Sequence, residues 1–497
     1  MASIMAERST LKALLKLTKH STIYGVGHVL TKSLSILLLP IHTNFVNKFE
    51  YGIATQLFTF LAITAIIYSY GLNIAYLQFY IQEKDREKKH DFFSTAFFAT
   101  LMTSMIFSTI LFLLRKPVAL ALFDSSDYHY LVLYSVAILT FDALALLSIN
   151  IFRAEEKTVG YAFFSVANVA FNLIFNIFFV GKLSLGVKGI FLANIFSSAL
   201  IFLLMLPFTF KRLRCSFSAA IYKKMLRFGL PFIPATMSIV VMNSIDRIFI
   251  KEIISLEASG IYGAGYKLGL IVKLFINAFQ FAWIPFFIST AIQENAKEIF
   301  SKILTYFALI CGVLFLVVTM YINQIVRFKI FGFTIFGEEY WGSTQIVPLV
   351  TLAYIAYGFY LNFLVGIYLK EKTKLLVVTT GTGAIINILG NLLLIPKYGI
   401  MGAACATVFS YLSMTFLIYF ISRQYYYIKY EFQKIAKIGI ICVFIYLIYA
   451  EINLPFEAAA KILLVGFYFI LAFFLKIFEP GEIDLFRNLL SKKISKR

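Results

Sequence analysis

The sequence predicts an all-α membrane protein with about fourteen transmembrane helices, and three observations lead to this fold class. Of the 497 residues, 60% are hydrophobic and only 14% are charged, and the mean hydropathy is +0.84. A soluble domain could not bury so much apolar surface, whereas helices in lipid satisfy their own backbone hydrogen bonds. Apolar runs of about 20 residues, long enough to cross a bilayer, recur along the whole chain.

The predicted spans form two sets of six, followed by a final pair. They cover residues 21–44, 52–80, 92–114, 130–152, 158–181, 187–210, 228–250, 260–289, 303–322, 344–369, 375–395, 401–421, 436–450 and 458–478. We expect an amino-terminal lobe at 1–210 and a carboxy-terminal lobe at 228–421, joined by a cytoplasmic linker at 211–227. Residues 422–497 are predicted to add two carboxy-terminal helices and a basic tail.

The distribution of basic residues predicts one orientation in the membrane. The termini and the even-numbered loops hold 31 of the 45 Lys and Arg residues, and the odd-numbered loops hold 10. Because Lys and Arg gather on the cytoplasmic side, both termini are predicted to lie in the cytoplasm, with the protein in the inner (cytoplasmic) membrane. This rule accounts for the net charge of +20 without a nucleic-acid partner. The first twenty residues are polar and basic, so no removable signal peptide is expected.

A sequence repeat links the two halves of the chain. In each half, two Asn residues four apart on one span precede two Gly residues three apart at the next span: Asn172, Asn176, Gly186 and Gly189, then Asn387, Asn391, Gly399 and Gly402. The repeat is six spans long, an even number, so the two lobes share one orientation. Such parallel repeats are related by an axis along the membrane normal, with the substrate path at their interface. The Asn residues themselves are typical of hydrogen bonds between helices.

Charged residues inside the predicted spans are the candidate functional residues, because a charge in lipid is costly unless it faces protein or water. They are Lys32, Asp142, Asp246, Arg247, Lys267 and Lys273. Span one carries a polar stripe at helical spacing, made of Tyr24, His28, Lys32, Ser35 and His42. Span eight places Lys273 and Asn277 on one face. We expect these stripes to line a basic cavity between the lobes, suited to an anionic, hydroxyl-rich substrate.

Each candidate also has a structural interpretation. Asp246 and Arg247 are adjacent and could form a local ion pair, and Asp142 could make a helix–helix hydrogen bond. Lys267 lies near one end of its span, from which its ammonium could reach the membrane interface. If transport is coupled to an ion, Asp142 and Asp246 are the candidate coupling residues.

The sequence shows no sign of an enzyme or of a metal site. There is no Gly-rich phosphate loop and no HExxH motif, so neither bound nucleotide nor zinc is predicted. The four Cys residues are widely spaced, which predicts neither a disulfide framework nor a metal cluster. No cofactor is therefore expected.

Several blocks of sequence resemble the polysaccharide (O-antigen-type) flippase family, which shares a superfamily with multidrug antiporters and the peptidoglycan lipid flippase. The first is LRFGLPFIP at 226–234, and the others lie at 25–27, 39–40, 50–52, 246–247, 260–267, 282–286, 391–396 and 399–404. The resemblance implies export of a polyprenyl-pyrophosphate-linked oligosaccharide for surface polysaccharide synthesis by alternating access. It further implies a cationic cavity lined by spans one, two, seven and eight.

The resemblance assigns substrate binding to the bases on those spans, with His28 and Asn277 added from the polar stripes: Lys32, Arg247, Lys267 and Lys273. It implies a proton or sodium gradient as the energy source. The expected partners are the lipid-linked glycan and the bilayer, with a polysaccharide polymerase and chain-length proteins as candidates, and a monomer is expected. Two alternatives stay open. A cation-coupled multidrug antiporter should have more buried acids than bases. A glycan polymerase or ligase should carry catalytic residues on large outer loops.

Overall fold

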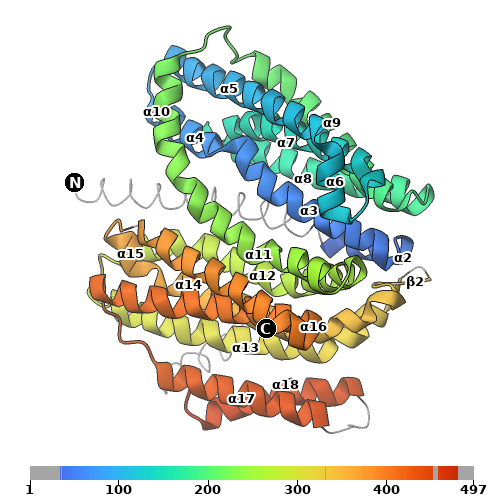
Figure 1. Cartoon of the computed structure of the whole chain (residues 1–497). Coiled ribbons are helices and arrows are strands. Elements are labelled where there is room, and N and C mark those ends of the chain that lie inside the picture. Colours follow the sequence, from blue (N-terminus) through green and yellow to red (C-terminus); the bar gives the residue numbers. More distant parts are fainter. Residues whose placement is uncertain are drawn as a thin grey trace, which may run out of the picture.

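The computed structural model describes residues 34, 36–155, 157–330, 332–372, 374–451 and 457–478. Two helical lobes face each other, and a helical hairpin lies against the second lobe (Figure 1). Helices α2 to α9 build the amino-terminal lobe, and α11 to α16 build the carboxy-terminal lobe. The hairpin, α17 and α18, contacts α13. The predicted all-α fold with two lobes and two additional helices is confirmed.

The amino-terminal lobe contains these elements: α2 (Leu39–Phe45), α3 (Lys48–Ser69), α4 (Leu72–Gln82), α5 (Arg86–Leu113), α6 (Arg115–Phe123), the 3₁₀ turn η1 (Ser126–Tyr128), α7 (His129–Ala154), α8 (Thr158–Asn176), the π-helical turn η2 (Ile177–Lys182) and α9 (Gly186–Phe210). The chain then forms α10 (Ala219–Gly229) and the 3₁₀ turn η3 (Leu230–Phe232).

The carboxy-terminal lobe contains α11 (Ile233–Ile253), α12 (Leu256–Thr290), α13 (Ala296–Arg327), strands β1 (Lys329–Ile330) and β2 (Phe333–Thr334), the 3₁₀ helix η4 (Glu338–Ile346), α14 (Val347–Phe363), α15 (Val365–Leu369) and α16 (Lys374–Tyr425). The helical pair beside it consists of α17 (Phe432–Glu451) and α18 (Glu457–Phe474). The two short strands pair antiparallel. The two strands β1 and β2 form a small β-hairpin, and we name the end of the molecule where they lie the hairpin end; this name does not refer to the helical pair α17 and α18. The opposite end, at residues 211–227, is the linker end.

Eleven helices in the described part of the chain are long and apolar enough to cross a membrane. The longest, α16, contains two helices on either side of Gly399, and α18 contributes a shorter apolar stretch at Ala459–Phe474. The first predicted span, 21–44, lies mostly outside the described residues. The total of fourteen therefore stays a prediction.

The second predicted span, 52–80, is wrong as a single helix. The chain breaks between α3 and α4 at Tyr70 and Gly71, whose φ angles are 28° and 78°. At this break the backbone of Gly71 meets that of Gly229, because a Cβ on Gly71 would lie 2.4 Å from the Gly229 carbonyl oxygen. Periodicity could not reveal the break, because both sides of it are equally apolar.

The second half of the predicted linker is a helix that packs on the amino-terminal lobe. Ser218 caps α10 by accepting a hydrogen bond from the Ile221 amide. The helix has one apolar face, which contacts α4 and α5. Residues 211–227 are therefore a structured connection between the lobes.

The internal repeat is visible in the backbone of both lobes. The Asn176 amide donates to the Asn172 carbonyl at 2.8 Å, and the Asn391 amide donates to the Asn387 carbonyl at 2.9 Å. The following turns use left-handed glycines with nearly the same φ, 54° at Gly186 and 57° at Gly399. The two halves therefore repeat in structure as well as in sequence.

The lobes meet at the hairpin end through a reciprocal glycine contact. A Cβ on Gly52 of α3 would lie 2.1 Å from the Leu256 carbonyl oxygen, and a Cβ on Gly260 of α12 would lie 2.4 Å from the Lys48 carbonyl oxygen. Each glycine thus faces the start of the other helix, as expected around a two-fold axis. Glycine is required here because only a residue without a side chain lets the backbones approach so closely. We call this contact the glycine seam.

Polar contacts reinforce closure at the hairpin end. The Tyr340 hydroxyl donates to the Val46 carbonyl at 2.7 Å, and the Gly337 amide donates to the Thr43 hydroxyl at 3.0 Å. The Lys251 ammonium of α11 lies 2.5 Å from the carboxylate of Asp124 in the other lobe. The structure is therefore closed between the lobes at this end.

Gly52→Ala is expected to destabilise the closed arrangement by about 1–3 kcal/mol, the usual cost of overpacking. The added methyl group would overlap a backbone carbonyl, which cannot rotate away as a side chain can. The measurement is the melting temperature of the purified protein in detergent, with Gly439→Ala as the control, because a Cβ there meets no atom within 4 Å. Equal melting temperatures for the two variants would contradict the tight seam.

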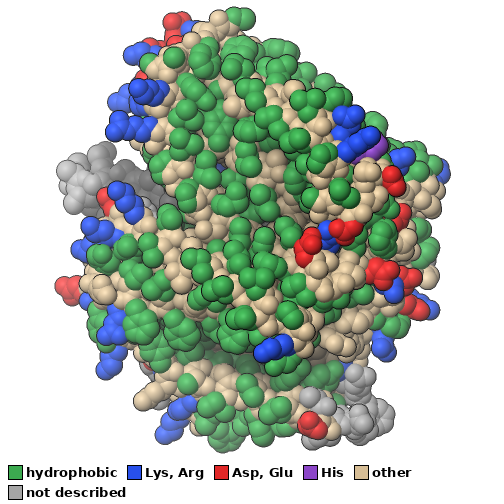
Figure 2. All heavy atoms as spheres, viewed as in Figure 1, with side chains coloured by type: hydrophobic (Ala, Val, Ile, Leu, Met, Phe, Trp, Pro, Cys, Tyr) green, Lys and Arg blue, Asp and Glu red, His purple; other side chains and the backbone are tan. Residues whose placement is uncertain are grey.

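The surface agrees with a membrane-spanning orientation along the axis from linker end to hairpin end. Figure 2 shows hydrophobic side chains over the middle of the visible face, with Lys and Arg gathered at its left edge, where Figure 1 places α10. Acidic and basic side chains mix at the opposite edge. The linker end is therefore the more basic end of this face.

Candidate functional site

A cavity of about 330 Å³ lies between the two lobes. Its walls come from α2, α3, α8 and α9 on one side and from α11, α12 and α14 on the other. Among the described residues that line it, three are charged side chains of Lys or Arg, and none is Asp or Glu: Arg247, Lys267 and Lys273. Thr55, Thr59, Asn172 and Asn194 add hydroxyl and amide groups. The cavity is therefore positively charged, with polar groups set among apolar side chains such as Leu38, Phe58 and Leu270.

Four other predicted site residues are not among the described residues that line the cavity. His28 and Lys32 fall outside the described residues, so their place in the site stays a prediction. Asn277 is on α12 but is not part of the cavity wall. Asp142 is exposed on α7 and does not line the cavity either.

Lys267 presents its charge among neutral and aromatic groups. Its ammonium donates to the Tyr51 hydroxyl at 2.9 Å and lies 5.2 Å from the ring centres of both Tyr51 and Phe58. In the described part of the chain no carboxylate lies within ion-pair distance of it. An ammonium with only these partners is available to an anionic ligand.

Lys273 is held by an amide on the neighbouring helix. Its ammonium donates to the Asn243 side-chain oxygen at 2.9 Å and lies 4.8 Å from the Tyr354 ring centre. The Tyr411 hydroxyl donates to the same Asn243 oxygen at 3.1 Å. The position of Lys273 is thus set by α11, α14 and α16 together.

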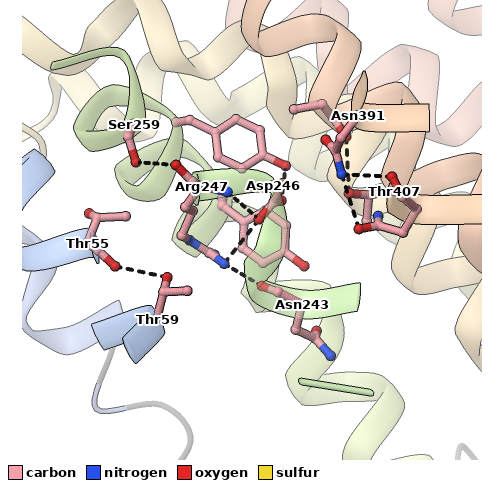
Figure 3. A network of polar contacts seen from close by, with 12 residues as sticks. Thr55, Thr59, Asn243, Asp246, Arg247, Ser259, Asn391 and Thr407 are labelled. Atoms are coloured by element: carbon pink, nitrogen blue, oxygen red, sulfur yellow. Dashed lines mark hydrogen bonds and ion pairs between the residues drawn. The ribbon is translucent and has the colours of Figure 1, made fainter. Parts of the chain in front are cut away.

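Asp246 and Arg247 form an ion pair on α11, with α3 facing them (Figure 3). The Arg247 guanidinium lies 3.4 Å from the Asp246 carboxylate, donates to the Asn243 carbonyl, and stacks 4.5 Å from the centre of the Tyr266 ring. Asp246 is fully buried and also accepts from the Tyr262 hydroxyl at 2.5 Å. Both carboxylate oxygens are thus engaged, whereas Arg247 also reaches the cavity wall. A coupling role for Asp246 stays a prediction.

The resemblance implied that span two, which includes most of α3, lines the cavity, but sequence reasoning named no residue on it. Tyr51, Thr55 and Thr59 recur every four residues on one face, and this stripe was the available signal. The Gln56 amide donates to the Arg247 carbonyl at 2.7 Å and to the Ser259 hydroxyl at 2.9 Å, which ties α3 to both cavity helices of the other lobe. A neutral polar stripe is a weaker signal than a buried lysine, so it carried no prediction.

Several solved structures share this fold. The lipid II flippase MurJ in an inward closed conformation matches with a TM-score of 0.75 and 14% identity, over 94% of this chain and 100% of that chain. An inward-facing multidrug resistance MATE family transporter of the MOP superfamily matches with a TM-score of 0.61 and 13% identity, over 82% and 95% of the two chains. A mutant of the Vibrio cholerae MATE transporter VcmN matches with a TM-score of 0.58 and 13% identity, over 84% and 98%.

The sequence comparison then gives the family. A model described as "Polysaccharide biosynthesis protein" matches residues 17–291, and the chain belongs to this family. Protein 1 of the Lsg locus of Haemophilus influenzae is 25% identical over 293 residues, which cover 56% of this chain and 68% of that protein. The family resemblance inferred from the sequence blocks is confirmed, and the protein is a multi-pass membrane protein of this family.

Proposed function

We propose that the protein moves a polyprenyl-pyrophosphate-linked oligosaccharide from the cytoplasmic to the outer leaflet of the inner membrane, for surface polysaccharide synthesis. The observation that carries the proposal is the interlobe cavity, whose charged lining residues are all basic in the described chain. The family is described by its part in polysaccharide biosynthesis. One of the solved structures that share the fold is the lipid II flippase MurJ. The reaction is a translocation, and no bond in the cargo changes.

The cavity has the size and chemistry for the headgroup of such a cargo. At about 330 Å³ it lies at the small end of the ~300–1,000 Å³ range of ligand pockets, which suits a pyrophosphate with its first sugar. Lys267, Lys273 and Arg247 would bind the phosphates, and the Thr hydroxyls of α3 would bind sugar hydroxyls. The polyprenyl chain would stay in lipid outside the cavity.

The closed hairpin end supports transport by alternating access. The glycine seam and its neighbouring polar contacts block that end, so the cargo would enter from the linker end, which we place in the cytoplasm on the basis of its charge. Release would require the seam to part. We propose a proton or sodium gradient as the energy source, with Asp142 and Asp246 as candidate coupling residues and no cofactor. We further propose a monomer that supplies a polysaccharide polymerase and chain-length proteins.

The test is reconstitution of the full chain in vesicles containing a short-chain polyprenyl-pyrophosphate disaccharide. The expected result is protein-dependent movement of the disaccharide between leaflets, measured as its accessibility to an added lectin. The same vesicles loaded with a cationic dye give the comparison. Dye movement without glycolipid movement would instead support the multidrug antiporter, and lengthening of the glycan would support a polymerase.

A further inference from the structure

His42 belongs to the polar stripe of span one that was expected to line the cavity, but the proposed mechanism assigns it no role. It lies on α2, is 1% exposed, and is part of the wall of the interlobe cavity. One ring nitrogen, Nε2, lies 2.8 Å from the Asn176 side-chain oxygen. The other, Nδ1, is buried and has no hydrogen-bond partner among the described residues. A buried polar atom without a partner needs an explanation, and this one belongs to a residue of the cavity wall.

The neighbouring amides determine which nitrogen carries the proton. The Asn176 side-chain nitrogen faces the backbone carbonyl of Asn172 at 2.8 Å. A carbonyl can only accept, so this atom must be the amide NH₂ group, and the atom facing His42 must be the amide oxygen. That oxygen in turn needs a donor, which is Nε2–H of His42. In the neutral ring Nδ1 is then an acceptor with a free lone pair.

His42 and Lys267 share one neighbour, Tyr51. The rings of His42 and Tyr51 have centroids 6.1 Å apart, and the Lys267 ammonium donates to the hydroxyl of the same Tyr51. Tyr51 therefore has both the imidazole and the ammonium as neighbours. A ligand that contacts both must combine an anionic group with a nearby hydrogen-bond donor.

The repeat shows that the fold alone does not need this histidine. Gly52 and Gly260 are equivalent across the glycine seam, and the helix-to-helix turns before them have equal length, so Ile250 occupies the place of His42 in the second lobe. In that lobe the oxygen of Asn391, the equivalent of Asn176, is buried without a partner among the described residues. The Asn pair is thus built in both lobes, but only the first carries an imidazole.

We propose that Nδ1 of His42 accepts a hydrogen bond from the first sugar of the cargo while Lys267 binds the adjacent phosphate. The two residues form a composite subsite for a glycosyl phosphate whose sugar carries a hydroxyl or amide N–H close to the phosphate. This inference rests on the proposed function. It adds an atom that recognises the sugar to a cavity whose Lys and Arg side chains recognise only negative charge.

Two substitutions separate this role from a structural one. His42→Gln places an amide near the position of Nε2, so it keeps a donor for Asn176 and removes the acceptor at Nδ1. His42→Asn places an amide oxygen near the position of Nδ1 and loses the contact with Asn176. Both are compared with wild type and Lys267→Gln, in the full chain in detergent, for binding of a short-chain polyprenyl-pyrophosphate disaccharide and of the same polyprenyl pyrophosphate without sugar.

His42→Gln is expected to weaken binding of the disaccharide probe about fivefold to tenfold and to change binding of the sugar-free probe less than twofold. His42→Asn should keep the preference for the sugar while lowering the melting temperature. Lys267→Gln should weaken both probes alike. If His42→Gln changes both probes equally or neither, the subsite is refuted while the proposed function stands. If wild type binds neither probe, the proposed function falls, and this inference falls with it.

Discussion

The double variant Lys267→Gln/Lys273→Gln should move the lipid-linked disaccharide about 100-fold more slowly than wild type. A hydrogen bond to a charged group contributes about 1.5–3 kcal/mol, and each 1.4 kcal/mol corresponds to about tenfold. Losing one such bond at each of two lysines therefore gives at least two factors of ten. The measurement is the initial rate of leaflet exchange in vesicles, with protein content matched.

The control variant changes the total charge of the protein by the same amount, at a site outside the cavity. Lys223 and Lys224 lie exposed on α10, outside the cavity, and their double replacement by Gln should leave the rate within about threefold of wild type. Lys267→Arg, which keeps the charge, should retain most of the activity. A cavity variant no slower than the α10 variant would show that the interlobe bases do not bind the cargo.

Asp246→Ala should lower the free energy of unfolding by about 3–5 kcal/mol, which is the cost of removing one partner from a buried ion pair. The change leaves Arg247 without its carboxylate and the Tyr262 hydroxyl without its acceptor. Denaturant unfolding of the purified protein, followed by its Trp fluorescence, measures the effect.

The double variant Asp246→Leu/Arg247→Leu should recover most of that stability, since it removes both charges together. The double variant should not transport the cargo, because the cavity loses the charge of Arg247. Asp127→Asn, at an exposed position in η1, is the control and should unfold like wild type. Equal losses in Asp246→Ala and in the double variant would mean that Asp246 stabilises the fold by something other than its pairing with Arg247.

The two-lobed fold was predictable because each of its signals is local in the sequence. Apolar length predicted the spans, and the spacing of Asn172, Asn176, Gly186 and Gly189 repeated in the second half. The break at Gly71 was not predictable from these signals. It depends on contact with Gly229, which only the packed lobes create.

The candidate site was predictable only in its charges. Lys267, Lys273 and Arg247 stand out in an apolar sequence, since each needs a reason to be in a membrane. Their partners do not stand out, because Tyr51 and Tyr354 look like ordinary residues of apolar helices. Their role depends on contacts across 216 residues in the case of Tyr51 and Lys267, which no local pattern encodes.

The docking of α10 has a consequence for how the halves can swing. This helix is fastened to α4 and α5 of the first lobe, yet the chain continues from it through η3 into α11 of the second lobe. Pro231 and Pro234 lie in this passage, where each removes a backbone donor and loosens the helical hydrogen bonds. Rotation between the halves must therefore be taken up by the few peptide units from Gly229 to Pro234. That short stretch is the hinge between the lobes, and α10 moves with the first lobe.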